Sequence, residues 1–283
     1  MPFRSVLAAS AIAGARRFCF TDGVKAQLPS DLTVEYTDAG RGAPLVLVHA
    51  FPLSRAMWRP QIEGLQANWR IFAPDLRGFG GTSDFAGPPS IAQMADDLAA
   101  LLDHIELHEP VVLGGLSMGG YVALAFAQKY PARLRALILA DTKAEADDAT
   151  GKANRDMMIA FAESHTAREV IDLVMPKMAT SPAAVEQVRA LASTQSTAGI
   201  ANAVRAMRDR PDASDVLPQI KVPTLVLVGS DDQLTPLPVA QSLAGRIEGS
   251  RLEVIPGAGH LSNMEQPAVF NDALRRFLAG LKT

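Results

Sequence analysis

The sequence predicts an α/β fold, a doubly wound and mostly parallel sheet with helices on both faces. Two observations predict this class. Strand-like apolar runs alternate with helical patterns from about residue 31 onward, as in chains built from successive right-handed crossover units. At 283 residues, 48% of them hydrophobic, the chain can also bury a large core within a single α/β unit.

Seven segments are expected to form strands. Residues 32–36 alternate between apolar and polar side chains, which is typical of an antiparallel edge strand. Residues 44–48 are continuously apolar, as in a strand that is buried on both faces. Residues 69–74 form a third strand whose proline must stand at its end. The other strands are expected at 111–113, 134–139, 224–228 and 252–255.

A helix is expected between the third and fourth of these strands. Ser90 is placed to cap its first turn, and Gln93 occupies the capping-box position. Apolar residues then recur at helical spacing on one face (Ile91, Met94, Leu98, Leu101, Leu102 and Ile105).

The segment 142–217 interrupts the alternation, because it shows helical patterns and no strand pattern. Helices inserted between two buried strands must lie beyond the sheet, and above the carboxyl ends of the strands they would cover a pocket. We therefore expect an α/β core over 25–142 and 218–283, a helical cap over 143–217, and an N-terminal extension over 1–24. The cap methionines either line an adaptable apolar pocket or simply pack helices together; they are Met157, Met158, Met175, Met178 and Met207.

Composition narrows the function classes. The net charge is −3 and no basic stripe is interleaved with aromatic residues, which argues against nucleic acid or an anionic membrane surface as the main partner. The single cysteine, Cys19, excludes a disulfide within the chain and a thiolate metal site. We expect a cytoplasmic protein that acts on a small molecule, with export as the alternative if residues 1–20 serve as a leader.

The segment Gly115-Leu116-Ser117-Met118-Gly119 joins the strand at 111–113 to a helical pattern. A sharp strand-to-helix turn holds its central serine in a strained backbone conformation and exposes the hydroxyl. The flanking glycines remove the Cβ atoms that would clash where the strand and the helix approach each other. Ser117 is therefore a candidate nucleophile.

A serine nucleophile needs a base, and His260 is the best candidate among the five histidines. It lies in a glycine-rich loop directly after the last strand, from which it can reach across the end of the sheet. His104 and His108 flank a helix end, and His165 lies in the cap segment, so structural or exposed positions are expected for these three. His49 directly follows a buried strand and is expected to bond backbone groups rather than to transfer protons.

The base needs an orienting carboxylate, and three aspartates compete for this role. Asp141 follows one strand, and Asp231 and Asp232 follow the next. All three lie at carboxyl ends of strands, where the sites of open α/β sheets gather. Each also satisfies the chain order serine, acid, histidine, so these arguments leave the choice open.

Over about residues 30–283 the chain resembles the α/β-hydrolase superfamily. The serine turn matches, and His49-Ala50-Phe51-Pro52 is similar to the family's His-Gly-x-Pro loop. Three further segments match: residues 75–80 with Ser83, residues 229–232 followed by Thr235-Pro236, and residues 257–260. In the family the acid lies three residues after the glycine and four before the proline, so the resemblance implies Asp232.

The resemblance also implies an oxyanion hole formed by the backbone N–H groups of Phe51 and Met118. Ala50 departs from the glycine that is usual in the family. If that position required a positive φ, alanine would cost about 1 kcal/mol of local strain. Otherwise its methyl group would only narrow the entrance of the pocket.

The implied activity is that of a serine hydrolase that works through an acyl-enzyme, with no metal and no organic cofactor. Segments 137–146 and 205–212 are similar to carboxylesterases and 3-oxoadipate enol-lactonase-like members. This similarity implies a small carboxylic ester or a lactone as substrate. Two alternatives remain: a cofactor-free perhydrolase activity at the same serine, and a ligand receptor on the same fold that does not turn over.

Overall fold

The computed structural model describes residues 23–83 and 89–281. Their centre is an eight-stranded sheet in the order β1-β2-β4-β3-β5-β6-β7-β8. The pairs β1–β2 and β2–β4 are antiparallel and all the others are parallel. The strands are β1 Val24–Gln27, β2 Thr33–Gly40, β3 Ala43–Val48, β4 Trp69–Pro74, β5 Val111–Leu116, β6 Leu134–Ala140, β7 Thr224–Gly229 and β8 Arg251–Ile255.

The predicted α/β class is confirmed, and one strand assignment is corrected. All seven expected strands are present, each within a few residues of its predicted bounds. The strand at 32–36 is wrong as an edge strand, because β2 lies between β1 and β4. The edge is β1, a four-residue strand with a single buried side chain, Ala26. So short and polar a segment carries little apolar periodicity by which a sequence pattern could identify it.

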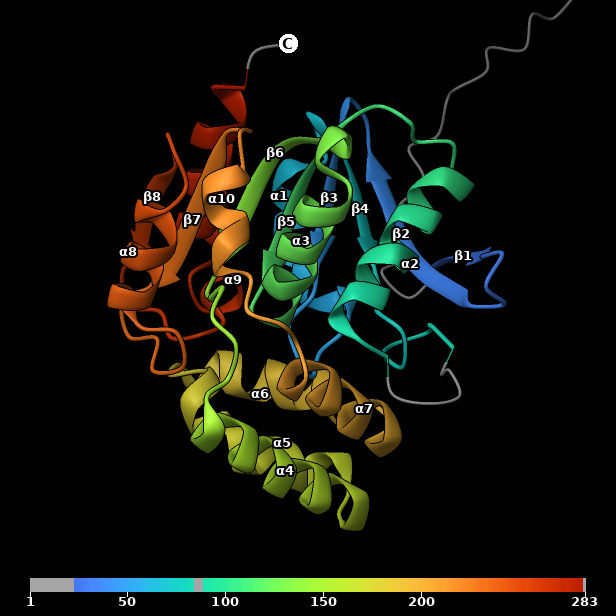
Figure 1. Ribbon diagram of the computed structural model, residues 1–283, viewed down its shortest axis with the longest axis vertical. Helices are drawn as coiled ribbons and strands as arrows, with labels where there is room; N and C mark the ends of the chain where they lie inside the picture. Colours follow the sequence, from blue (N-terminus) through green and yellow to red (C-terminus); the bar gives the residue numbers. More distant parts are fainter. Residues whose placement is uncertain (1–22, 84–88, 282–283) are drawn as a thin grey trace, which may run out of the picture.

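Helices cover both faces of the sheet (Figure 1). One face packs against α2, α3 and α8, and the other against α1 and α10. The helices are α1 Arg59–Leu65, α2 Ile91–His104, α3 Met118–Lys129, α4 Ala149–Ser164, α5 Ala167–Met178, α6 Pro182–Ala192, α7 Thr197–Arg208, α8 Leu237–Gly245, α9 Ser262–Glu265 and α10 Pro267–Ala279. Three short 3-10 helices add to these: η1 Arg55–Trp58, η2 Pro131–Arg133 and η3 Ser214–Gln219.

The helix expected after Ser90 is α2, and its capping box is only half formed. The Ser90 hydroxyl oxygen accepts a hydrogen bond from the Gln93 N–H at 3.0 Å. The Gln93 side chain does not reach back to the cap and instead donates to Asp97 Oδ1 at 3.4 Å. Asp97 also binds Arg77 through two hydrogen bonds of 2.6 Å, so the Gln93 amide is drawn toward this buried ion pair.

The helices α4 to α7 lie together beyond the carboxyl ends of the parallel strands (Figure 1). They occupy the segment in which the sequence predicted helices and no strand. The loops that follow β3, β5, β6, β7 and β8 lie at the same edge of the sheet, because these strands are parallel. They face the layer of inserted helices. A space therefore lies between the end of the sheet and the inserted helices, and the polar groups of those loops can face it.

The leader or extension expected within residues 1–24 lies almost wholly outside the described residues. Within 23–83 and 89–281, no helix is both long and apolar enough to cross a bilayer.

Candidate active site

Ser117 stands at the turn between β5 and α3 with φ of 55° and ψ of −114°. A positive φ is unusual for a residue with a Cβ atom and stores local strain. The glycines on either side are sterically required. A Cβ atom on Gly115 would lie 2.1 Å from the Gly119 carbonyl oxygen, and one on Gly119 would lie 2.2 Å from the Val48 carbonyl oxygen. The turn therefore leaves no room for a side chain at Gly115 or at Gly119.

Ser117, His260 and Asp232 form a continuous hydrogen-bonded relay. His260 Nε2 lies 2.8 Å from Ser117 Oγ. His260 Nδ1 lies 3.0 and 2.9 Å from the two carboxylate oxygens of Asp232. With the imidazole proton on Nδ1, which donates to the carboxylate, Nε2 is free to accept the hydroxyl proton of Ser117. These three residues come from loops after β5, β7 and β8.

The Asp232 carboxylate is held in its charged form. Its Oδ1 accepts from the backbone N–H groups of Leu234 and Thr235 at 2.8 and 3.0 Å, and its Oδ2 accepts from the Thr235 hydroxyl at 2.6 Å. Burial alone would raise the pKa of Asp232, but the hydrogen bonds from His260 and Thr235 outweigh burial and lower this pKa. A carboxylate fixed in this way can orient the imidazole and stabilise the imidazolium that forms when His260 takes a proton.

The other two aspartates considered above do not contact the imidazole. Asp231 is exposed, and its Oδ1 accepts from the neighbouring Ser230 hydroxyl at 3.1 Å. Asp141 is buried below the relay, where it accepts from the Gly229 N–H at 2.8 Å and from the Ser262 hydroxyl. Burial is the main cause that raises the pKa of Asp141 to about 7. Of the three candidates, only Asp232 lies within hydrogen-bond distance of His260.

The Phe51 and Met118 amides stand on the two loops that flank the serine. Met118 is the first residue of α3, and a first-turn N–H group has no partner within its own helix. Phe51 follows β3 and lines the same cavity as Ser117. Ala50 is buried and is absent from the described non-glycine residues with positive φ. Its methyl group therefore causes no backbone strain of the kind that glycine would relieve.

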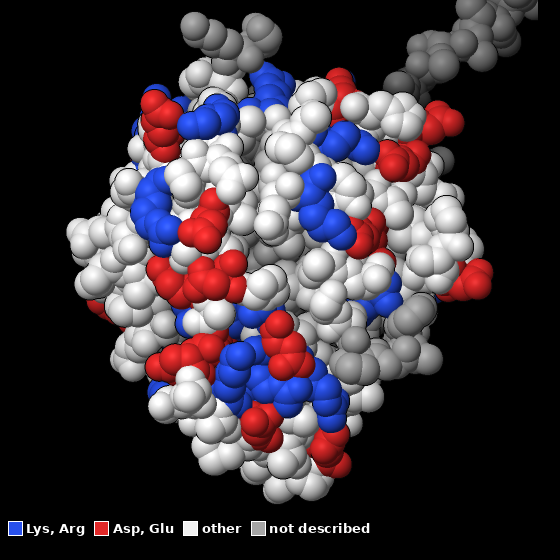
Figure 2. Space-filling view, viewed as in Figure 1, with Lys and Arg blue, Asp and Glu red and all other residues white. Residues whose placement is uncertain are grey.

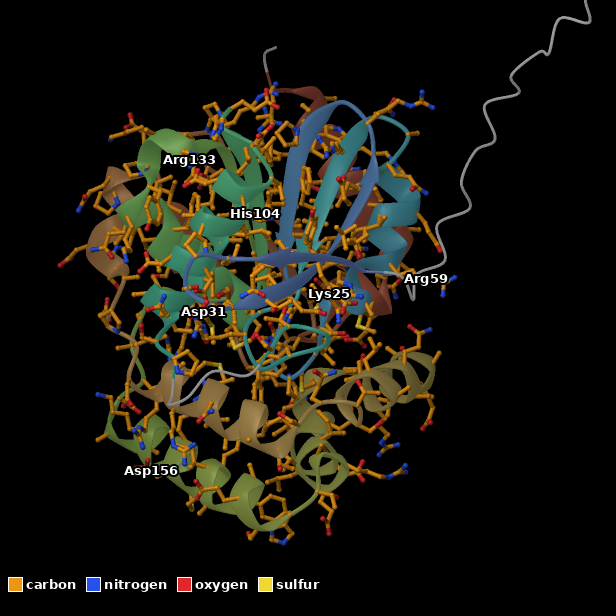
Figure 3. The ribbon with its side chains drawn as sticks, turned by 90° about the vertical axis from the view of Figure 1, so that its right-hand side faces the viewer. Lys25, Asp31, Arg59, His104, Arg133 and Asp156 are labelled. Atoms are coloured by element: carbon orange, nitrogen blue, oxygen red, sulfur yellow. The ribbon has the colours of Figure 1, made fainter. Side chains whose placement is uncertain are left out.

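The remaining histidines lie outside the relay. His49 is fully buried; its Nδ1 lies 3.0 Å from the Ala50 carbonyl oxygen, and its Nε2 accepts from the Leu76 N–H at 2.9 Å. Burial lowers the pKa of His49, so it acts as a neutral link between two loops. Figure 3 shows His104 on the core, away from the inserted helices. His108 and His165 are exposed, and His165 stacks on Phe161.

Ser117 and His260 open into a cavity of about 570 Å³ between the end of the sheet and the inserted helices. A cavity of this size can hold a small organic molecule. Three of the five methionines named above line it (Met158, Met178 and Met207). Met175 is instead buried among other side chains, and Met157 is 64% exposed. Lining of a pocket is thus correct for three of the methionines and helix packing for Met175, whereas Met157 fits neither interpretation.

Glu265 is a buried carboxylate that the sequence patterns did not single out. Its Oε1 accepts from the Gly259 N–H at 2.8 Å, next to His260. Its Oε2 accepts from the Thr180 N–H and hydroxyl at 2.7 and 2.6 Å and from the Ser181 N–H at 3.0 Å. Glu265 therefore ties the histidine loop to the connection between α5 and α6. A lone glutamate in a helical pattern gives no signal of such a role.

Charged side chains in the cavity were also missed. Lys143, Arg155, Lys177 and Asp147 all line it. Among the described residues, no group of three or more His, Cys, Asp or Glu side chains is arranged to hold a metal ion.

Comparison with known proteins identifies the family of the chain. Residues 43–267 match the family described as the alpha/beta hydrolase fold. The chain is 30% identical over 265 residues to 3-oxoadipate enol-lactonase 2 of Acinetobacter baylyi, covering 91% of this chain and 96% of the relative. A thermophilic esterase from Thermogutta terrifontis superposes with a TM-score of 0.89 at 39% identity, covering 93% of this chain and 100% of that one.

An enol-lactonase from Burkholderia xenovorans superposes with a TM-score of 0.83 at 26% identity, covering 90% of this chain and all of that one. The family match spans well over half of the sequence and includes the serine turn at residues 115–119. The chain belongs to the α/β-hydrolase fold family.

Proposed function

We propose that this protein is a serine hydrolase that cleaves a small carboxylic ester or a lactone through an acyl-enzyme. The observation that carries the proposal is the relay of Ser117, His260 and Asp232, of which Ser117 and His260 line the cavity beneath the inserted helices. The names of the similar proteins support the ester and lactone class, because they include enol-lactonases and an esterase.

The reaction follows from the positions of the protons. His260 Nε2 takes the hydroxyl proton as Ser117 Oγ attacks the carbonyl carbon, and Asp232 stabilises the resulting imidazolium. The Phe51 and Met118 N–H groups stabilise the oxyanion, a contribution of typically about 10²–10³ in rate for each donor. The protonated His260 then gives its proton to the leaving alkoxide. Water activated by the same imidazole hydrolyses the acyl-enzyme, which releases the acid and restores Ser117.

We assign residues 25–142 and 218–283 to the catalytic core and 143–217 to a cap that shapes the substrate cavity. This division is supported by the lining of the cavity. Phe51, Ser117 and His260 come from the core, whereas Met158, Val174 and Met207 come from α4, α5 and α7. Exchange of cap residues should therefore alter substrate preference more than the chemistry at Ser117.

Hydrolysis of p-nitrophenyl butyrate by wild type and by Ser117→Ala tests the proposal. We expect the variant to lose at least about 10³-fold in kcat, because no other group replaces the nucleophile. The matched control is Ser193→Ala on the exposed end of α6, whose hydroxyl donates only to the Ala190 carbonyl oxygen. It should keep wild-type activity, and equal activity in Ser117→Ala would contradict the proposal.

The same experiment separates the two alternatives. A single release of p-nitrophenol per molecule without further turnover would indicate a receptor. Peroxide-dependent bromination that exceeds hydrolysis, and that also disappears in Ser117→Ala, would indicate a perhydrolase.

A further inference from the structure

The cavity above Ser117 carries an excess of positive charge. Among the described residues that line it, Lys143, Arg155 and Lys177 are cationic and Asp147 is the only carboxylate. Lys143 and Arg155 are largely buried, with side chains 27% and 22% exposed. Charges in such a setting are less screened than on an open surface, so the imbalance acts on whatever occupies the cavity.

Asp147 does not neutralise these cations, because a third cation shares it. Its Oδ2 accepts from Arg155 Nε at 3.0 Å, and its Oδ1 lies 3.1 Å from Lys143 Nζ. Arg210 Nη2 also donates to Oδ1 at 3.0 Å. Burial would raise the pKa of Asp147, but its bonds to Arg210 and Arg155 lower it. One ionised carboxylate thus faces three cations, and Lys177 adds a fourth.

Part of this donor capacity has no partner within the described residues. Arg155 bonds there only through Nε, so its terminal nitrogens are available to a planar anion. Lys177, which is exposed at the cavity rim, forms no ion pair with any described residue. A guanidinium edge matches a carboxylate group in shape and charge.

The outer face of the inserted helices is different. Figure 2 shows its Lys and Arg side chains interspersed with acidic ones. On α7, Arg205 pairs with Glu163, and Arg208 pairs with Asp156 at 2.6 Å and with Asp209 at 2.8 Å. The surplus of positive charge is therefore a property of the cavity and not of the whole helical layer.

The cavity also has an apolar lining. Met158, Val174 and Met207 contribute to it, and they favour a hydrocarbon segment. The same cavity therefore offers a nucleophile, apolar side chains and an excess of cations. We propose that its substrate is an ester or lactone whose acyl group ends in a carboxylate, and that Arg155 with Lys177 binds that carboxylate. This inference rests on the proposed ester hydrolysis at Ser117.

The test compares monoethyl adipate with ethyl hexanoate, which share a six-carbon acyl chain and differ in the terminal carboxylate. Release of ethanol gives kcat/KM for each. We expect wild type to prefer the monoester at least tenfold. Arg155→Met should reduce that preference about tenfold, chiefly through a higher KM for the monoester. Lys177→Met should act in the same direction.

Matched control variants remove positive charge elsewhere on the same helices. The controls are Arg168→Met and Lys152→Met. Arg168 lies on α5, where its Nε is 3.9 Å from Asp172, and Lys152 lies on the exposed side of α4. Neither residue lines the cavity, so both variants should keep the wild-type preference. An equal loss in these controls would mean that general charge attraction, and not a carboxylate subsite, sets the preference.

Calorimetry keeps the inference separate from the proposed reaction. Titration of monoethyl adipate into Ser117→Ala should show binding that weakens about tenfold when Arg155→Met is added. Wild type that hydrolyses both esters equally, with Arg155→Met affecting both alike, would overturn the subsite and leave the ester hydrolase standing. Absence of hydrolysis in wild type would overturn the reaction, and calorimetry would still decide on the subsite.

Discussion

Replacement of Asp232 by asparagine tests how the relay sets the state of the imidazole. Asp232 Oδ1 accepts from two backbone N–H groups, those of Leu234 and Thr235, so the amide oxygen of an asparagine must take this position. The NH₂ group then replaces Oδ2, which is the oxygen nearer to His260 Nδ1, at 2.9 Å against 3.0 Å for Oδ1. Because an NH₂ group only donates, it drives the imidazole proton to Nε2.

A protonated Nε2 can no longer accept the hydroxyl proton of Ser117. Loss of the correct tautomer typically costs about 10⁴-fold in kcat, which corresponds to about 5 kcal/mol of activation free energy. We therefore expect Asp232→Asn to lose about 10³–10⁴-fold in kcat for p-nitrophenyl butyrate while the protein stays folded, because the shape of the side chain is kept.

Asp231→Asn is the matched control, since Asp231 is the exposed neighbour and binds only the Ser230 side chain. It should stay within about threefold of wild type, as is usual for surface substitutions. Steady-state kinetics and thermal unfolding of both variants supply the comparison. If Asp231→Asn were as impaired as Asp232→Asn, or if Asp232→Asn kept more than a tenth of the activity, the tautomer argument would be refuted.

Three further predictions concern stability and positioning. Burial raises the pKa of Asp141 from 3.8 to about 7. The contribution of Asp141 to the free energy of unfolding is therefore full below about pH 4 and falls by about 4 kcal/mol as the pH rises to about 7. In urea titrations the free energy of unfolding of Asp141→Asn should rise relative to that of wild type over this pH range, and a pH-independent difference would contradict this. In Glu265→Gln an NH₂ group replaces one carboxylate oxygen, so the N–H group of either Gly259 or Thr180 loses its acceptor. We expect a lower kcat and a lower melting temperature, whereas Glu248→Gln, at an exposed position, should change neither. Ala50→Gly should destabilise by about 0.5–1 kcal/mol, because φ at this position is not positive; a stabilised variant would show that alanine is strained there.

The parts of the fold that follow from apolar periodicity were predictable. The strands β3, β5, β6 and β7 are largely apolar and buried between helical layers, so their patterns survive in the sequence. The strand β1 is short and largely exposed. It exists because β2 offers an unpaired edge, which is a property of the folded sheet and not of the segment itself.

The candidate site divides in the same way. Ser117 and His260 stand beside glycines whose local geometry can be anticipated, because a Cβ atom would collide at Gly115 and Gly119. The choice among Asp141, Asp231 and Asp232 depends on which carboxylate meets His260 across 28 residues of chain. Position after a strand does not determine which carboxylate contacts His260, and only the family resemblance identified Asp232 beforehand.

Arg155 and Glu265 were beyond sequence reasoning for a related reason. Arg155 looks like any charged residue of an amphipathic helix until the fold turns it into the cavity beside Asp147. Glu265 acts on Thr180, which lies 85 residues earlier in the chain. Their roles arise from charge and hydrogen-bond balance between distant segments, and no spacing in the sequence encodes such a balance.

The central claim is that Ser117 becomes covalently acylated with the help of His260. The most direct measurement is reaction with diisopropyl fluorophosphate followed by mass spectrometry of the digested protein. We predict one adduct per molecule, located on Ser117, with loss of hydrolysis in proportion to labelling, and labelling at least about 10²-fold slower in His260→Ala. An adduct on another residue, or hydrolysis that persists in fully labelled protein, would contradict the account.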